Sequence, residues 1–299
     1  MKFGTFLFEP KKVEGFDFDL YILKQENGKL GTSQIDMYNQ IACFGDSVTA
    51  TKHPDWVSES KLGLAKRGNN RYNFLWDTLC PTVEEYRQHI LDYITEVDKI
   101  GLGIFLSTIH FADHGYCTCK RCNRKWKASG LEWLDWRKKI VTEFVMDVKE
   151  RVKKPLTIGL PPHVANLDEC CGLDLNSLDS YADAFNVVMC SQNYATACYW
   201  EMLARAFKKI LKKPVYVSLY ICGPGDDPRR IPTVDELLKL SVRVGRNGID
   251  GILFISDTAE RVREFQKAAV ERVGLRDELK TYGCQPVLDL VDKWEKILK

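Results

Sequence analysis

Closely spaced cysteines stand in the middle of the chain with the spacing C-x-C-x-x-C. They are Cys117, Cys119 and Cys122. Thiolates at this spacing are typical zinc ligands, and a structural zinc ion takes four ligands in a tetrahedron. Cys80 is the best candidate for the fourth ligand. It precedes a predicted helix, and Cys117 follows the strand that comes after this helix. Both residues should therefore lie at the same end of the predicted strands. His110 and His114 are the alternatives to Cys80. We expect one closed structural zinc site.

Ionisable side chains lie between a predicted strand and these cysteines. The apolar run 103–106 predicts a buried strand, and Ser107, Thr108, His110 and Asp113 follow it. In barrel enzymes, residues that follow the carboxyl end of a strand form the active-site rim. We predict that Asp113 is a general acid/base and that His110 tunes it. The alternative is that these polar residues only line a loop which the cysteines hold together.

Polar side chains also follow other predicted strands, where they form a rim rich in carboxylates. Glycosidases need two carboxyl groups across the scissile bond, and we predict Asp226 as the second one. Some of these residues have an alternative, purely structural role: Asp257 as a helix N-cap, Asp226 as a turn residue and Glu9 as the end of a strand. The predicted substrate-binding residues of the rim are Glu9, Asp46, Gln192, Asn193, Tyr220 and Asp257.

Aromatic side chains near this rim are predicted to stack on sugar rings. Trp56 and Trp76 are the first candidates, because both belong to the long segment 48–79, which has little hydrophobic periodicity. Tyr72 and Tyr194 are further candidates. Long loops in compact domains are usually functional or disordered, and the tryptophans argue against disorder. We therefore predict a functional third loop over residues 48–79.

Apolar runs that alternate with amphipathic segments predict the elements that position these residues. From residue 82 onward, strands and helices follow each other with short connections, which favours a parallel sheet covered by helices. Thr82-x-x-Glu85 and Thr233-x-x-Glu236 predict capping boxes. The predicted strands are 2–8, 19–24, 41–44, 103–106, 155–160, 186–190, 214–221 and 251–255. The predicted helices are 33–40, 82–101, 131–152, 177–185, 196–211, one that begins at 233, 257–273 and 287–298.

Eight predicted strands are the number that closes a (β/α)8 barrel. We therefore predict an α/β protein with one (β/α)8 TIM barrel domain over residues 1–299, reduced early helices and a C-terminal helix. A doubly wound open sheet is the competing fold. It predicts a glycine-rich phosphate turn after the first strand, and the sequence has none there.

Charge and composition exclude several kinds of partner. The 299 residues contain 43 basic and 41 acidic side chains, so the net charge of +2 indicates neither nucleic-acid nor membrane binding. No signal peptide or membrane-spanning run is recognisable, which predicts a cytoplasmic protein. Eleven cysteines in a cytosolic chain favour metal binding and buried thiols over disulfides. The oligomeric state is not predicted.

Two groups of residues resemble a known family. Cys80-Pro81-Thr82, then Tyr86-Arg87, and then Tyr116-Cys117-x-Cys119-x-x-Cys122 resemble the zinc-bearing β-galactosidases of glycoside hydrolase family 42. His53-Pro54-Asp55-Trp56 is similar to a segment common in glycosidase-like barrels. The resemblance covers about 48–126. It implies a (β/α)8 barrel, activity on a carbohydrate, and a zinc ion held by the four cysteines beside the catalytic face.

The chain departs from this family at both catalytic glutamates. Ser107-Thr108 stand where the resemblance places the acid/base after strand four, and residues 220–227 contain no glutamate. The first prediction is a glycoside-hydrolase-like enzyme with a carboxylate pair at the barrel rim. The alternative is a catalytically inactive barrel that binds a carbohydrate or another partner. A third hypothesis is metal-dependent hydrolysis, which requires an open metal site built from His110, His114 and Asp113.

Overall fold

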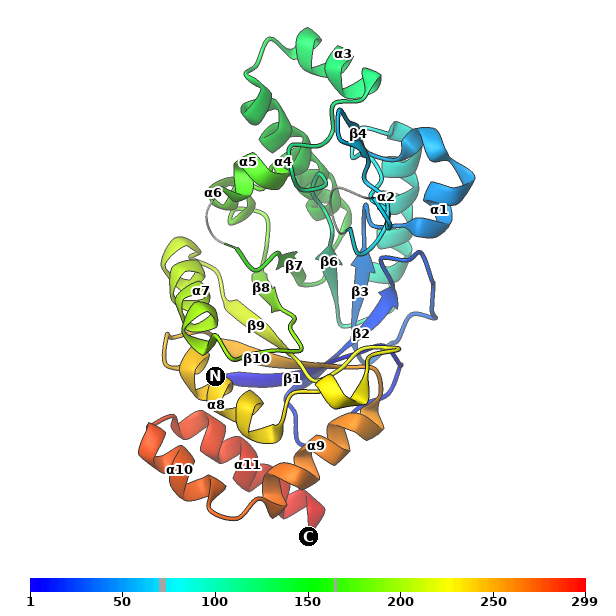
Figure 1. Cartoon of the computed structure of the whole chain (residues 1–299). Coiled ribbons are helices and arrows are strands. Elements are labelled where there is room, and N and C mark those ends of the chain that lie inside the picture. The colour runs from blue at the N-terminus through cyan, green and yellow to red at the C-terminus, as the bar shows by residue number, and fades with distance from the viewer. Residues whose placement is uncertain (70–73, 164–165) are drawn as a thin grey trace. The chain divides into compact units, whose positions relative to one another are not determined.

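Parallel strands form one closed eight-stranded barrel in the computed structural model, which describes residues 1–69, 74–163 and 166–299 (Figure 1). The strand order around the barrel is β1-β10-β9-β8-β7-β6-β3-β2. The predicted single parallel barrel is therefore confirmed. Its strands are β1 (Lys2–Leu7), β2 (Phe18–Lys24), β3 (Tyr38–Ala42), β6 (Gly103–Ser107), β7 (Leu156–Leu160), β8 (Ala184–Met189), β9 (Val215–Tyr220) and β10 (Gly251–Ser256).

Glycine begins two of these strands for the same steric reason. A Cβ on Gly103 would lie 2.6 Å from the Tyr38 ring and 2.8 Å from Pro155 O. A Cβ on Gly251 would lie 2.7 Å or less from the Tyr216 ring and 2.6 Å from Lys2 O. In each case the ring belongs to a residue that pairs with the glycine across the ladder. Only glycine allows this close approach.

The chain divides into two compact units, which are described in turn. The first comprises residues 1–22, 159–162 and 184–299. Its helix α11 docks through Trp294, whose fully buried ring contacts Phe16, Phe254 and Phe265. Its helices are α7 (Ala197–Ile210), the 3-10 turn η2 (Pro228–Arg230), α8 (Val234–Gly245), α9 (Ala259–Glu271), α10 (Leu275–Tyr282) and α11 (Gln285–Leu298).

The second unit comprises residues 23–158 and 163–183. Helices α2 and α4 pack against each other there, and Arg87 on α2 forms an ion pair with Asp147 on α4 at 2.7 Å. Its remaining elements are α1 (Ser47–Lys52), the 3-10 turn η1 (Pro54–Trp56), the hairpin β4 (Glu59–Ser60) and β5 (Gly63–Leu64), α2 (Glu84–Asp98), α3 (Lys120–Ser129), α4 (Trp133–Arg151), α5 (Leu167–Cys171) and α6 (Leu175–Leu178).

Several sequence predictions are wrong in detail. No helix covers 33–40, because the Asn39 side chain bonds both the N–H and the carbonyl of Gln34 and holds the backbone in a turn before β3. The helix predicted over 177–185 is α6, which ends at Leu178, and β8 begins at Ala184. Helices α1, α3, α5 and α10 were not predicted.

The segment 48–79 is not a plain loop, because it contains most of α1, then η1 and the β4–β5 hairpin. Of the two predicted capping boxes, the one at Thr233 is present, with Glu236 as its reciprocal partner. The one at Thr82 is absent, because α2 has Val83 as its N-cap and no side chain caps it. Within the described ranges, no helix combines the length and the apolar character needed to cross a bilayer.

Candidate functional site

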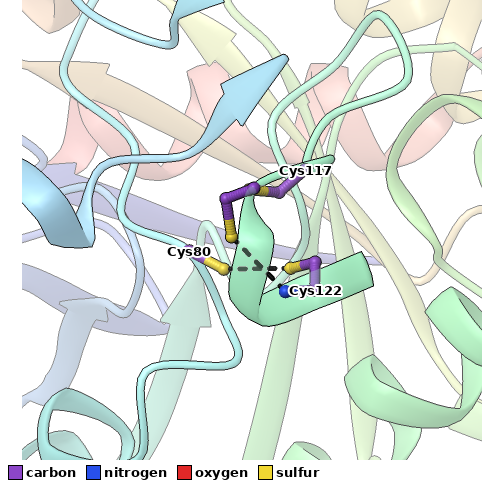
Figure 2. A group of neighbouring side chains, drawn as sticks. Cys80, Cys117 and Cys122 are labelled. Carbon is purple, nitrogen blue, oxygen red and sulfur yellow. Dashed lines mark hydrogen bonds between the residues drawn. The ribbon is translucent and has the colours of Figure 1, made fainter. Parts of the chain in front are cut away.

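The four cysteines predicted from sequence meet in the second unit. All four are buried, and their sulfurs lie within 4.8 Å of one another. Figure 2 shows the sulfurs of Cys80 and Cys122 pointing toward each other, and they are 3.3 Å apart. A tetrahedral zinc ion with Zn–S bonds of about 2.3 Å holds its sulfurs about 3.8 Å apart. The donor set therefore fits a closed four-thiolate site after small side-chain adjustments.

Three local structures bring these sulfurs together. Cys80 is held by its N–H, which donates to Trp56 O at 2.8 Å. Cys119 is the N-cap of α3, and its sulfur accepts from the N–H of Cys122 at 3.4 Å. The β4–β5 hairpin adds a third contact, because the Glu59 N–H donates to Cys117 Sγ at 3.2 Å. Backbone N–H groups that point at sulfur stabilise the thiolate form that binds metal.

Thr82 also belongs to this cluster. Its buried hydroxyl lies 3.1 Å from Cys80 Sγ and 3.4 Å from Cys122 Sγ. The Cys117 thiol lowers the pKa of Cys119, and the thiols of Cys122 and Cys80 add to this effect. A lowered thiol pKa favours the thiolate, which is the form that binds a cation.

A carboxyl group that sequence analysis missed lies at the carboxyl end of the barrel strands. Glu26 follows β2 and is half-buried, and its Oε1 is 2.9 Å from Ser107 Oγ at the end of β6. Burial raises the pKa of Glu26, although its own backbone N–H, Ser107 and Lys24 favour the carboxylate. Nothing in the local sequence Gln25-Glu26-Asn27-Gly28 distinguishes this residue from an ordinary turn glutamate.

The hydrogen bonds around Ser107 also fit a protonated Glu26. With its amide nitrogen donating to Lys24 O at 3.3 Å, Gln40 accepts from Ala42 N at 3.2 Å and from Ser107 Oγ at 2.5 Å. The single hydroxyl proton of Ser107 then goes to Gln40, and Ser107 Oγ is free to accept a proton from Glu26. This arrangement of Gln40 and Ser107 is compatible with a protonated Glu26.

Asp46 has a different environment from the one predicted. Its carboxylate caps α1 by accepting from Thr49 N at 2.8 Å, and it pairs with Lys24 at 3.2 Å. The Tyr86 hydroxyl donates to it at 3.0 Å. Burial opposes ionisation, but Lys24, Thr49 and Tyr86 together lower the pKa of Asp46. These contacts make Asp46 a buried structural anion.

The predicted residues after β6 lie in a strained and partly buried loop. Thr108 has a φ of 49°, which is unusual for a β-branched residue, and its Oγ1 accepts from Gly45 N at 3.1 Å. His110 Nδ1 is 2.7 Å from Phe111 O, and burial lowers the pKa of His110. Asp113 Oδ1 is buried and has no hydrogen-bond partner among the described residues. His110, Asp113 and the buried Cys171 offer ligand atoms within 4.8 Å of one another.

The predicted rim residues of the first unit mostly hold local structure. Glu9 Oε1 accepts from Ala259 N at the start of α9, at 2.7 Å. The N-cap of α9 is Thr258, so the alternative prediction that Asp257 caps this helix is wrong. Asp257 instead accepts from the Cys222 thiol at 3.1 Å. These two carboxylates therefore stand at one end of one helix.

The other polar residues of this unit form short turns. Asp226 accepts from the Tyr220 hydroxyl at 2.6 Å and from Gly223 N at 2.7 Å, so its carboxylate closes the turn after β9. Asn193 is exposed and accepts from Ala195 N at 2.8 Å, while Gln192 is half-buried. The structure thus brings Tyr220 and Asp226 together.

The predicted aromatic platforms have distinct positions. Trp56 stacks on His53 with a centroid separation of 3.9 Å, and it is half-buried. Trp76 and Glu26 both flank Gly45, where a Cβ would lie 3.1 Å from Trp76 Cδ1 and 3.2 Å from Glu26 Cβ. Tyr194 is buried, and its hydroxyl donates to Met189 O, so it is a core residue. Tyr72 lies outside the described residues. Trp76 therefore lies near the Glu26 side chain.

Comparisons with solved structures find glycosidase barrels. An α-L-fucosidase isoenzyme 2 from Paenibacillus thiaminolyticus matches 99% of this chain with a TM-score of 0.63 and 12% identity. A β-N-acetylhexosaminidase from Bacteroides fragilis matches 98% with a TM-score of 0.53 and 9% identity. The catalytic domain of a β-amylase from Paenibacillus polymyxa matches 96% with a TM-score of 0.50 and 8% identity.

At these identities the likeness shows the barrel fold alone. The chain spans 49% of the fucosidase chain, 66% of the hexosaminidase chain and 98% of the amylase domain. No protein-family model matches the sequence, and no curated protein matches it either. The residues of the site therefore have to carry the functional argument.

Proposed function

We propose that this chain is a glycoside-hydrolase-like enzyme that acts on a carbohydrate, with Glu26 as its proton donor. The observation that carries the proposal is the hydrogen-bonded carboxyl group of Glu26 beside Ser107, with its raised pKa. A glycosidase acid must stay protonated near neutral pH to protonate the leaving oxygen, and burial achieves this. The structural similarity to barrels named as glycosidases supports the same reaction class.

The role of proton donor was predicted for Asp113, and we assign it to Glu26 for a specific reason. Ser107 and Gln40 form a hydrogen-bond chain that accommodates the proton on Glu26. Asp113 Oδ1 has no such partner among the described residues. Trp76, which flanks Gly45 together with Glu26, is the proposed sugar-stacking residue. Asp226 stays the predicted second carboxylate.

The test compares leaving groups in the variant Glu26→Gln. A general acid contributes about 10²- to 10⁴-fold when the leaving group needs a proton. We expect Glu26→Gln to lose activity by that factor on alkyl or disaccharide substrates and far less on dinitrophenyl glycosides, whose leaving group departs without a proton. Glu96→Gln, an exposed substitution on α2, is the matched control.

Two outcomes would contradict the proposal. An equal loss on both kinds of substrate would mean that Glu26 does not act as the acid. No turnover of any glycoside in a broad panel, together with carbohydrate binding by calorimetry, would favour the inactive carbohydrate-binding barrel. That alternative is consistent with Ser107-Thr108 standing where the family 42 resemblance places its acid/base.

We also propose that Cys80, Cys117, Cys119 and Cys122 hold one structural zinc ion. Four buried sulfurs supply the four ligands of a tetrahedral structural site, and the resemblance to family 42 supports the same assignment. When bound, the ion would replace thiol protons and join α3, the β4–β5 hairpin and the start of α2. The proposed role is to stiffen the loops beside the rim.

A further inference from the structure

We propose a second metal site, with an open ligand position, formed by His110, Asp113 and Cys171. His110 and Asp113 lie in the loop after β6, and Cys171 is the last residue of α5, which follows β7. The paired residues of the neighbouring parallel strands β6 and β7 belong to the second unit. Their ligand atoms lie within 4.8 Å of one another. The site therefore lies at the carboxyl end of the strands, where barrel enzymes carry their chemistry.

Each of the three side chains presents a suitable atom. When Nδ1–H of His110 donates to Phe111 O at 2.7 Å, the tautomer leaves Nε2 with a free lone pair. Metal-binding histidines are commonly held in this way by a carbonyl on the other nitrogen. Asp113 Oδ1 is buried without a hydrogen-bond partner among the described residues, whereas buried polar atoms normally have one. A metal ion would give this oxygen a direct partner.

Cys171 supplies the third donor, and its position at the end of α5 is held by neighbouring residues. Its backbone carbonyl accepts from Phe111 N at 3.1 Å, which joins the end of α5 to the loop after β6. The buried Arg137 donates to Glu169 O and Cys170 O and lies over the Phe111 ring at 5.0 Å. The Cys171 thiol now donates to Leu167 O at 3.2 Å, so a metal would replace that proton.

Glycine at position 172 completes the support. Its φ is 80°, and a Cβ there would lie 3.1 Å from Arg137 O and 3.3 Å from the Phe111 ring. The backbone thus reverses directly after Cys171 and lets the end of α5 approach the loop after β6. A site in which a loop is joined to the end of a helix is held more firmly than a site on one loop, as metal coordination requires.

One imidazole, one carboxylate and one thiolate select a borderline divalent ion of the zinc or cobalt type. Such an ion holds its ligands about 3.3–3.7 Å apart, so modest rotation of Asp113 and Cys171 would complete the contacts. Three protein ligands leave a fourth position for water or a substrate oxygen. Arg137 adds a positive charge nearby, which opposes binding of the metal ion itself and favours an anionic fourth ligand.

This site differs from the open metal site predicted from sequence. That prediction used His114, but His114 does not belong to the group of converging donors. The proposed second metal site includes neither Glu26 nor any residue of the four-cysteine cluster. It therefore does not depend on the roles proposed for them.

Metal stoichiometry separates the two sites. We expect the zinc-reconstituted protein to hold about two ions per chain, and Cys171→Ser and Cys119→Ser to lose about one each. Cys43→Ser is the matched control, because Cys43 is a buried thiol in the same unit that also donates to a carbonyl. If Cys171→Ser fails to fold by circular dichroism, the half-buried His110→Ala replaces it.

Cobalt spectroscopy tests the open position. In the cobalt-loaded protein, azide should change the visible d–d spectrum, because only the three-ligand site has room for it. The response should persist in Cys43→Ser and disappear in Cys171→Ser or His110→Ala. Equal metal content in Cys171→Ser and the parent protein would overturn the site. Two bound ions with no response to azide would overturn its open position.

Discussion

Glu26 shows how burial and hydrogen bonding decide the behaviour of one carboxyl group. Burial raises its pKa, so the folded chain binds a proton at this residue that the unfolded chain releases from about pH 4.3 upward. Ionised Glu26 therefore destabilises the fold as the pH rises between the unfolded and the folded pKa. The residue proposed as the general acid therefore lowers the free energy of unfolding at high pH.

We therefore expect Glu26→Gln to raise the free energy of unfolding at pH 8 and to change it little at pH 4. The glutamine keeps the shape of the protonated acid and removes the charge. Urea unfolding at the two pH values, with Glu96→Gln as the exposed control, measures this difference. Destabilisation by Glu26→Gln at pH 8 would show that the carboxylate is the favoured form.

Asp46 gives the opposite sign. Lys24, Thr49 and Tyr86 lower its pKa, so its contribution to stability is complete above the unfolded value of about 3.9 and is lost as the pH falls through the folded pKa. Its side chain is 7% exposed and that of Lys24 is 4% exposed, so the pair is buried. Removing one partner leaves the other charge uncompensated.

We expect Asp46→Asn to lower the free energy of unfolding by about 3–5 kcal/mol at pH 7, the usual cost of breaking a buried pair. The deficit should shrink as the pH falls below about 4, because the unfolded parent chain then binds a proton at Asp46 and the folded carboxylate follows only at its lower pKa. Guanidinium unfolding across this pH range checks both statements. A deficit that stays constant down to pH 2 would contradict the assigned role of the ion pair.

At the scale of elements, the four-cysteine cluster joins segments that local sequence does not join. Thr118 N donates to Glu59 O at 2.7 Å, and Glu59 N donates to Cys117 Sγ, so the β4–β5 hairpin is fastened to the cysteine loop. The hairpin has only two residues in each strand. Such a short hairpin depends on its attachment for stability.

Removal of the proposed zinc, by chelation or by Cys119→Ser, should speed amide exchange in the hairpin and in the loop 117–122. Residues 251–256 of β10, in the other unit, should keep their protection. Hydrogen–deuterium exchange with mass spectrometry follows both regions, with Cys43→Ser as the control. Unchanged exchange in the hairpin after complete metal loss would mean that the cluster does not stiffen this loop.

At the scale of the molecule, a closed barrel has no edge strand, so each of its strands has two neighbours. We expect the barrel to unfold in one cooperative transition, although the chain divides into two compact units. The fully buried Trp294 belongs to the first unit, so its replacement tests whether a change in one unit also destabilises the other. Its replacement by alanine removes the large ring that α11 places against Phe254 and Phe265.

Trp294→Ala should lower the free energy of unfolding by about 3–5 kcal/mol. Exchange of the strongly protected amides in β3 and β6 of the second unit should accelerate as much as exchange in β10. Hydrogen exchange under native conditions gives the comparison. If β3 and β6 keep the parent protection while β10 loses it, the two units unfold separately.

The sequence by itself determined the barrel strands and the metal-type cysteines. Strand identity depends on local apolar runs, and the eight runs became the eight barrel strands with small changes of boundary. The Thr233 box formed because its partner is three residues away. The C-x-C-x-x-C spacing put its sulfurs near each other by chain connectivity, and the Cys80 sulfur lies with them in the structure.

Only the tertiary structure decided which polar groups are buried and what faces them. Glu26 gains its raised pKa from burial beside Ser107, 81 residues away along the chain. Thr82 fits a capping box by pattern, yet its hydroxyl lies beside Cys122, 40 residues away. Cys171 meets His110 and Asp113 because β6 and β7 are neighbours. Desolvation and convergence depend on distant partners, and no local pattern contains them.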